Sequence, residues 1–160
     1  MKVVKTIAIV LLVILVLIQF YRPEKNKSDT VPTTDITMVT NMPPDVKKTL
    51  QQACYDCHSN NTVYPVYYNF EPIAYWMANH VEDGKRHLDF SEWGNYSDKK
   101  KADKLNHAIK MVKNHKMPLD SYTWMHPEGK LSESQITGFT NWAKQYMAVN
   151  NLKEEENRPQ

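Results

Sequence analysis

The chain has 160 residues, of which 41% are hydrophobic and 24% are charged, and its formal net charge is +2. This length accommodates one membrane or signal segment and one domain of roughly 100 residues, but not a second domain. The small net charge, without a glycine-rich phosphate loop or a long basic tract in the sequence, argues against nucleic acid as a partner.

Residues 1–22 have the pattern of an export signal, because Lys2 and Lys5 precede an uncharged run rich in Ile, Leu and Val. No small-x-small cleavage site follows Phe20, so we expect an uncleaved signal anchor, a transmembrane helix over residues 1–22. Removal of the segment after export is the alternative. The N-terminal lysines predict a single-pass protein of the cytoplasmic membrane whose remaining residues lie on the periplasmic, exported side.

Residues 23–42 are polar, contain Pro23 and Pro32 and show no helical period. This composition predicts a flexible tether between the anchor and a domain over residues 43–149. The domain begins with helix-start chemistry at Pro43, Pro44 and Asp45. Apolar residues then follow at three- and four-residue spacing, which predicts a helix of about three turns.

The end of this first helix carries the most specific motif of the chain, Cys54-Tyr55-Asp56-Cys57-His58, with the only two cysteines. Cys-x-x-Cys-His is the attachment signature of c-type haem. Cysteines at i and i+3 share one helix face and can form thioethers to two vinyl groups, while His58 can serve as proximal axial ligand. The alternatives are a dithiol redox centre, a disulfide or half a zinc site. The first belongs to a βαβ setting, and the last normally needs four ligands.

Aromatic residues dominate the next loop and predict one wall of a cofactor crevice, with ordinary core packing as the alternative: Tyr64, Tyr67, Tyr68 and Phe70. A second helix is expected from about Glu71, with Gly84 as its end. Its apolar stripe contains Ile73, Trp76, Met77, His80 and Val81.

The third helix is predicted to start at the N-cap Ser97, with a buried stripe of Ala102, Leu105, Ile109 and Val112. Its other face is basic: Lys99, Lys100, Lys101, Lys104, Lys110 and Lys113, with Lys116 beyond. This face indicates either an ordinary solvated surface or an electrostatic docking surface for an acidic redox partner.

Met117 is the candidate sixth ligand of the iron. It follows a helix, and Pro118 forces it out of helical geometry, so that its sulfur can be directed at the iron. His126, His115 and His80 are the competitors, and an open coordination site is a further alternative.

Residues 119–131 read as an irregular loop, and Ser132-Glu133-Ser134-Gln135 predicts a capping box at the start of the last helix. That helix has an apolar face of Ile136, Phe139, Ala143, Tyr146 and Met147. Residues 150–160, with three consecutive glutamates, predict a disordered charged tail.

Several separated motifs carry a family resemblance. They are Cys54-Tyr55-Asp56-Cys57-His58-Ser59-Asn60-Asn61-Thr62, the segment 84–93, Met117-Pro118-Leu119 with Tyr122 and His126-Pro127, and Leu131-Ser132 before Trp142. Together they resemble the haem-binding domain family of exported bacterial proteins, over about residues 43–148. The resemblance implies a small all-α, cytochrome c-like domain of about four helices around one covalent haem c. It implies that Cys54 and Cys57 hold the porphyrin, with His58 proximal and Met117 distal.

The leading hypothesis is a membrane-tethered monohaem c-type cytochrome with His/Met axial ligation, which transfers one electron between redox partner proteins and is not an enzyme. The alternative is a haem-based peroxidase, or a gas or redox sensor, with a vacant or displaceable distal site. His115 or His126 would then serve as acid and base. A third hypothesis is a scaffold in which haem only nucleates folding.

Overall fold

The computed structural model describes residues 1–153, in which helices are joined by turns and no strand occurs. The predicted all-α class is therefore confirmed. Four helices of ten residues or more follow the N-terminal helix in this range: α3 (Pro44–Ala53), α5 (Ile73–His87), α6 (Asp98–Lys113) and α8 (Glu133–Val149). Short elements join them: α2 (Ile36–Val39), α4 (Tyr55–His58), α7 (Asp120–Met125) and the 3-10 turns η1 (Val66–Asn69), η2 (Phe90–Asn95) and η3 (Pro127–Gly129).

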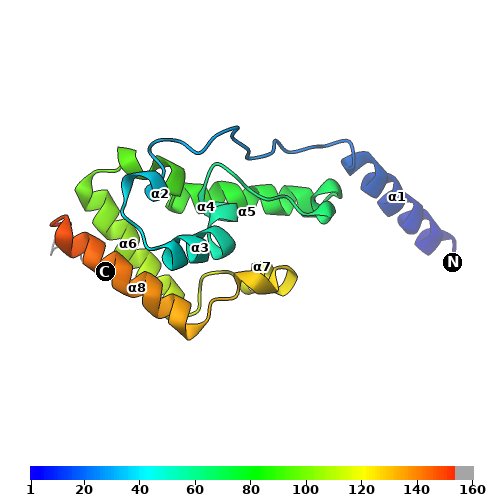
Figure 1. Cartoon of the computed structure of the whole chain (residues 1–160). Helices are drawn as coiled ribbons and strands as arrows, with labels where there is room; N and C mark the ends of the chain where they lie inside the picture. Colours follow the sequence, from blue (N-terminus) through cyan, green and yellow to red (C-terminus); the bar gives the residue numbers. More distant parts are fainter. Residues whose placement is uncertain (154–160) are drawn as a thin grey trace, which may run out of the picture.

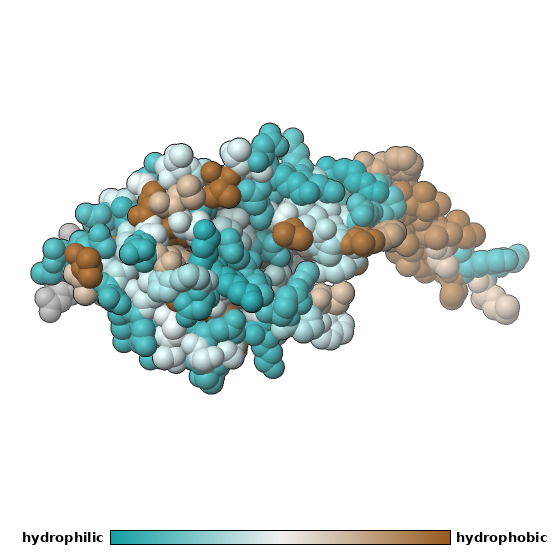
Figure 2. All heavy atoms as spheres, viewed as in Figure 1, coloured by the Kyte–Doolittle hydropathy of each residue, from teal (hydrophilic) through white to brown (hydrophobic). Residues whose placement is uncertain are grey.

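The N-terminal helix α1 (Lys2–Ile18) extends away from the other helices and has no buried residue (Figure 1). It is the large apolar surface in Figure 2. It ends at Ile18, and the next side chain, Gln19, bonds to the backbone N–H and carbonyl of Glu71 at 3.1 and 3.0 Å. Within residues 1–153, no helix combines the length and the apolar character needed to cross a membrane. The spanning helix predicted over residues 1–22 is thus not found, because the helix that forms has only 17 residues.

The predicted flexible tether, residues 23–42, is bound to the domain over much of its length. The Asn26 side-chain amide donates to the carbonyl of Ser59 at 2.7 Å, and the Thr34 hydroxyl donates to the carbonyl of Ser91 at 2.6 Å. Ile36 is fully buried in the main core. The polar side chains that made this segment resemble a linker are therefore used as hydrogen-bonding groups, and the folded unit begins before residue 43.

Asp35 connects this segment to the cysteine motif. Its carboxylate is 1% exposed and caps α2 by accepting from the Thr37 N–H at 2.9 Å. The same oxygen accepts from the Tyr55 hydroxyl at 2.7 Å. Tyr55 is the first residue of α4 and lies between Cys54 and Cys57 in the chain, so its bond to Asp35 helps to orient α4.

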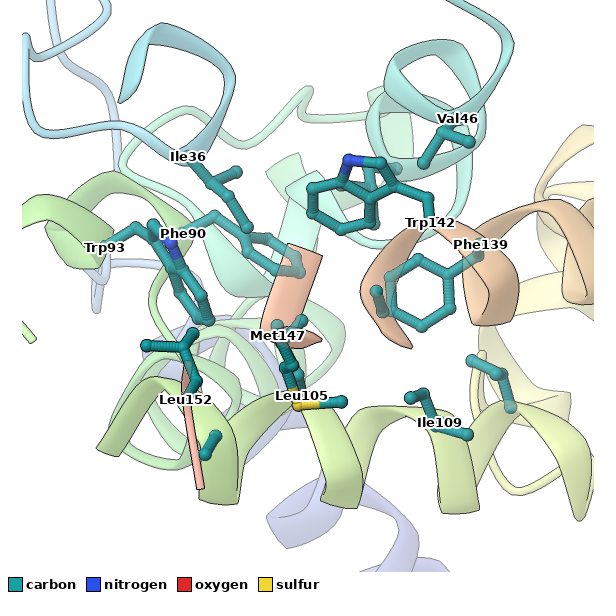
Figure 3. Packing of buried hydrophobic residues seen from close by; sticks show 14 of the residues in the cluster. Ile36, Val46, Phe90, Trp93, Leu105, Ile109, Phe139, Trp142, Met147 and Leu152 are labelled. Carbon is teal, nitrogen blue, oxygen red and sulfur yellow. The ribbon is translucent and has the colours of Figure 1, made fainter. Parts of the chain in front are cut away.

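The main core lies between α6, α8, α3 and the η2 turn. Trp93 and Ala143 are fully buried, and Leu105 and Ile109 of α6 face Met147 and Phe139 of α8 (Figure 3). Leu152 also belongs to this core, so the predicted tail from residue 150 is packed at its start. Residues 154–160 lie outside the described residues.

Local sequence signals set the borders of two of the core helices. The Ser97 hydroxyl accepts from the Lys100 N–H at the start of α6, and Ser132 forms the predicted capping box with Gln135 at the start of α8. Both predicted starts are confirmed. The region predicted as an irregular loop, residues 119–131, instead contains α7 and η3.

Replacement of Ile36 tests whether residues 26–36 belong to the folded domain. Ile36→Ala is expected to lower the free energy of unfolding by about 2–5 kcal/mol, because it leaves a cavity in the core. Val39→Ala, an exposed position of the same short helix, is the control and should change it by less than about 0.5 kcal/mol. Denaturant unfolding of the purified protein measures both values. Equal, small effects would show that the segment is not part of the core.

Candidate functional site

A cavity of about 440 Å³ opens between α3, α5, α6 and the turn that follows α6. Its walls are mainly apolar and include Leu50, Phe90 and Phe139. All four predicted site residues line it, although they are up to 63 positions apart in the chain: Cys54, Cys57, His58 and Met117. A pocket of this size with few polar groups is suited to a flat, apolar cofactor.

Cys54 and Cys57 are free thiols at the edge of α4. The sequence predicted one helix that carries the motif at its end, but this helix is interrupted at Cys54. Cys54 has φ −126° and ψ −37°, so α3 ends at Ala53 and a separate short helix, α4, starts at Tyr55. Burial, followed by the charge of Cys57, raises the pKa of Cys54 to about 12. Burial, followed by the charge of Asp56, raises the pKa of Cys57 to about 11. Both groups are therefore thiols at neutral pH, whereas a dithiol redox centre uses a thiol of lowered pKa.

The zinc alternative also loses support. Among residues 1–153, no group of three or more His, Cys, Asp or Glu side chains is placed to hold a metal ion. A structural zinc site needs four such ligands. The two cysteines and His58 therefore do not form a zinc site with the other described side chains.

His58 is fixed by one hydrogen bond. Its Nδ1 lies 2.9 Å from the carbonyl oxygen of Leu88, so this nitrogen donates and the ring is the Nδ1–H tautomer. Burial lowers the pKa of His58 below its ordinary value, against the opposing effect of the Leu88 bond. The neutral ring keeps the lone pair of Nε2 available, which is the requirement for an imidazole that ligates a metal.

Gly84 allows α5 to pack directly on the cysteine motif. A Cβ at this position would overlap the carbonyl oxygen of Cys57 and would lie 3.1 Å from the Cys57 Cβ. The sequence predicted that Gly84 ends its helix, but α5 continues to His87. That prediction was wrong because the glycine serves close packing inside the helix and not a left-handed C-cap.

Met117 reaches the cavity through a tight reversal after α6. His115 has a positive φ of 51°, and the N–H groups of Lys116 and Met117 both bond to the carbonyl of Met111, at 2.8 and 3.3 Å. Met117 also packs against the main core. Met111 lines the same cavity, so two thioethers are available there, and the sequence reasoning named only one.

The three histidines that were alternatives to Met117 differ in whether they line the cavity. His115 and His126 do not line the cavity. His126 bonds to the Tyr67 hydroxyl at 2.7 Å and stacks on Tyr122 with a centroid distance of 4.6 Å. His80 does line the cavity, and its Nδ1 bonds to the carbonyl of Trp76 at 2.8 Å. His80 is therefore the histidine competitor that keeps a place at the site.

Tyr122 and Asp56 form a polar pair in the cavity wall. The Tyr122 hydroxyl donates to Asp56 Oδ2 at 2.9 Å, and the N–H of Val63 donates to Asp56 Oδ1 at 2.9 Å. Burial, followed by the charge of Asp56, raises the pKa of Tyr122. This pair holds α7 against the cysteine motif. The aromatic wall predicted at residues 64–70 was wrong, because none of Tyr64, Tyr67, Tyr68 and Phe70 lines the cavity, and Tyr122 of α7 lines it instead.

Further residues at the cavity were missed by the sequence reasoning. Lys104, His107 and Met111 line it from α6. They follow one another at three- and four-residue spacing and share one face of the helix. The sequence shows this stripe beside the apolar one, but without the fold nothing distinguished it from solvated surface.

The geometry defines a helical protein whose cavity offers two thiols, a neutral imidazole and a thioether to one apolar ligand. The profile of the haem-binding domain family matches residues 13–145. The chain belongs to this family, and the family supports haem as its cofactor. Comparison with curated proteins and with solved structures finds no match. The match begins well before residue 43, in agreement with the packing of residues 26–36.

Substitution of Gly84 tests the close packing of α5 on the cysteine motif. Gly84→Ala should lower the free energy of unfolding by about 1–3 kcal/mol, because the new methyl group overlaps Cys57. The control is Gly138→Ala in α8, where the nearest atom to a new Cβ is 4.0 Å away. That change should stabilise the protein by about 0.5–1 kcal/mol, because alanine favours a helix. Chemical unfolding measures both, and stabilisation by both substitutions would contradict the packing argument.

Proposed function

We propose that the protein is a monohaem c-type cytochrome that transfers one electron between redox partner proteins. The observation that carries this proposal is that Cys54, Cys57, His58 and Met117 all line one apolar cavity. These side chains would supply two sites for thioether attachment and two iron ligands of different chemistry. In a chain of the haem-binding domain family, this donor set fits one haem c.

Each donor would have a separate task. Cys54 and Cys57, which both line the cavity, would hold the porphyrin through thioether bonds. His58 would bind iron through Nε2, because Nδ1 is occupied by Leu88. Met117 would bind on the opposite side, and its thioether would raise the reduction potential relative to a second histidine.

The remaining residues of the cavity exclude water and fix these ligands. The bound haem would supply one-electron cycling between ferric and ferrous iron. Leu50, Phe90 and Phe139 provide a low-dielectric surrounding, and the carbonyl of Leu88 keeps the His58 ring in one orientation. A donor set that changes little between the two oxidation states is what an electron carrier requires.

Location and partners form part of the same proposal. Haem is attached to Cys-x-x-Cys-His motifs outside the cytoplasm, so we place the domain on the periplasmic side of the cytoplasmic membrane. Lipid is the proposed partner of the exposed apolar surface of α1, and exported redox proteins are the proposed electron donors and acceptors.

The peroxidase or sensor alternative has less support. It relied on His115 or His126 as acid and base, and neither lines the cavity. His126 is held by Tyr67 and Glu128, at 2.7 and 3.3 Å. We therefore favour electron transfer without bond-making chemistry.

Ligand binding to the haem-loaded protein tests the carrier against the alternative. An electron carrier with both axial positions filled should give a six-coordinate, low-spin spectrum that changes little on addition of carbon monoxide to the reduced protein or cyanide to the oxidised one. Rapid conversion by either ligand, from a high-spin starting spectrum, would favour the enzyme or sensor. A colourless protein from a cell competent in cytochrome maturation would refute the proposal itself.

Paired methionine substitutions test the distal ligand. Met117→Ala should leave the covalent haem in place, remove the sulfur-to-iron absorption band of the oxidised protein and lower the reduction potential. Met111→Ala is the matched control, because its thioether lines the same cavity, and the band should persist. Near-infrared absorption and redox titration measure the outcome. Loss of the band only in Met111→Ala would exchange the two assignments, and absence of the band from the wild-type protein would point to a nitrogen ligand such as His80.

A further inference from the structure

Lys104 is a half-buried cation in the cavity wall. It lies on α6 and is the only lysine or arginine among the residues that line the cavity in the described part of the chain. No ion pair or hydrogen bond of its ammonium group to another residue of the range 1–153 is present. The charge is therefore partly removed from water without a protein counter-ion, which costs free energy.

Two other partly buried lysines have a carboxylate partner, whereas Lys47 of α3, also partly buried, has none among the described residues. Lys85 Nζ lies 3.7 Å from a carboxylate oxygen of Asp89, and Lys101 Nζ lies 3.6 Å from one of Asp98. Lys101 is on the same helix as Lys104, one turn earlier. The missing counter-ion of Lys104 is thus not a general property of α6.

The carboxylates of the cavity wall do not fill this role. Asp56 accepts hydrogen bonds from Tyr122 and Val63, and Asp83 forms an ion pair with Arg86. His107, one turn after Lys104 on the same helix face, adds a second possible donor at the wall. This part of the cavity is therefore cationic and can donate hydrogen bonds.

We propose that Lys104, assisted by His107, binds a carboxylate group of the cavity's ligand. This inference rests on the proposed function, and for haem the carboxylate is a propionate. Lys104 would provide a charge-assisted hydrogen bond, and His107 a weaker one. The ligand would in turn supply the counter-ion that the protein lacks, so Lys104 is a positioning residue for the cofactor.

The charge of Lys104 would also affect the reduction potential of the haem. A cation close to the porphyrin disfavours the ferric state, which carries one more positive charge than the ferrous state. Its removal leaves the propionate charge unmasked and stabilises ferric iron further. Neutralising Lys104 should therefore lower the midpoint potential of the isolated, haem-loaded protein.

The test is a redox titration of the full haem-loaded chain. Lys104→Met should lower the midpoint potential, Lys104→Arg should leave it close to that of the wild type, and Lys110→Met should also leave it unchanged. Lys110 is the matched control because it is an exposed lysine of α6 that does not line the cavity. If Lys104→Met does not fold, Lys104→Gln is compared with Lys110→Gln in the same titration.

Equal midpoint potentials of the Lys104 and Lys110 variants would overturn the inference, and so would a Lys104→Arg potential as low as that of Lys104→Met. A surface lysine that only attracts an acidic partner would change the rate with that partner, and would not change the potential of the isolated protein. Absence of covalent haem from the wild type would instead refute the proposed function. The two failures are thus distinguishable.

Discussion

The contact of α5 with the cysteine motif is the constraint on which the site depends. Gly84 lets the helix approach the backbone of Cys57, and the same helix ends so that the Leu88 carbonyl accepts from His58 Nδ1. One helix therefore sets both the position of a cysteine and the orientation of the imidazole. The cavity lies beside this contact, because Cys57, His58 and Gly84 all line it.

A second set of interactions supports the motif from the N-terminal side. The buried Asp35 accepts from Tyr55, and Asn26 bonds to the carbonyl of Ser59. Lys85 of α5 donates to the side chains of Asn26 and Asn60, at 2.9 and 2.6 Å. These bonds hold the motif between α5 and a segment with little secondary structure, so the site is built from three separate parts of the chain.

Local chemistry explains what the sequence could predict. The Cys-x-x-Cys-His motif predicts three site residues because they are neighbours in the chain, and the caps at Ser97 and Ser132 depend on residues within one turn. Met117 was predicted from the adjacent proline, and it does line the cavity. In contrast, Lys104 and Met111 become site residues only when α6 is placed beside the cavity. Gly84 was wrongly predicted to end its helix, because the sequence alone does not distinguish a glycine needed for close packing from one that caps a helix. Residues 26–36 were predicted to be a tether, because the residues they bind lie far away in the sequence.

The bonds at the end of α1 limit how far the domain can move from that helix. Gln19 is joined to Glu71, and the Arg22 side chain donates to the carbonyl of Asn69 at 2.8 Å. The domain is therefore bound to the chain within a few residues of the end of α1, and no long flexible linker separates the two. Any surface that binds α1 would therefore also limit the distance over which the cavity can move.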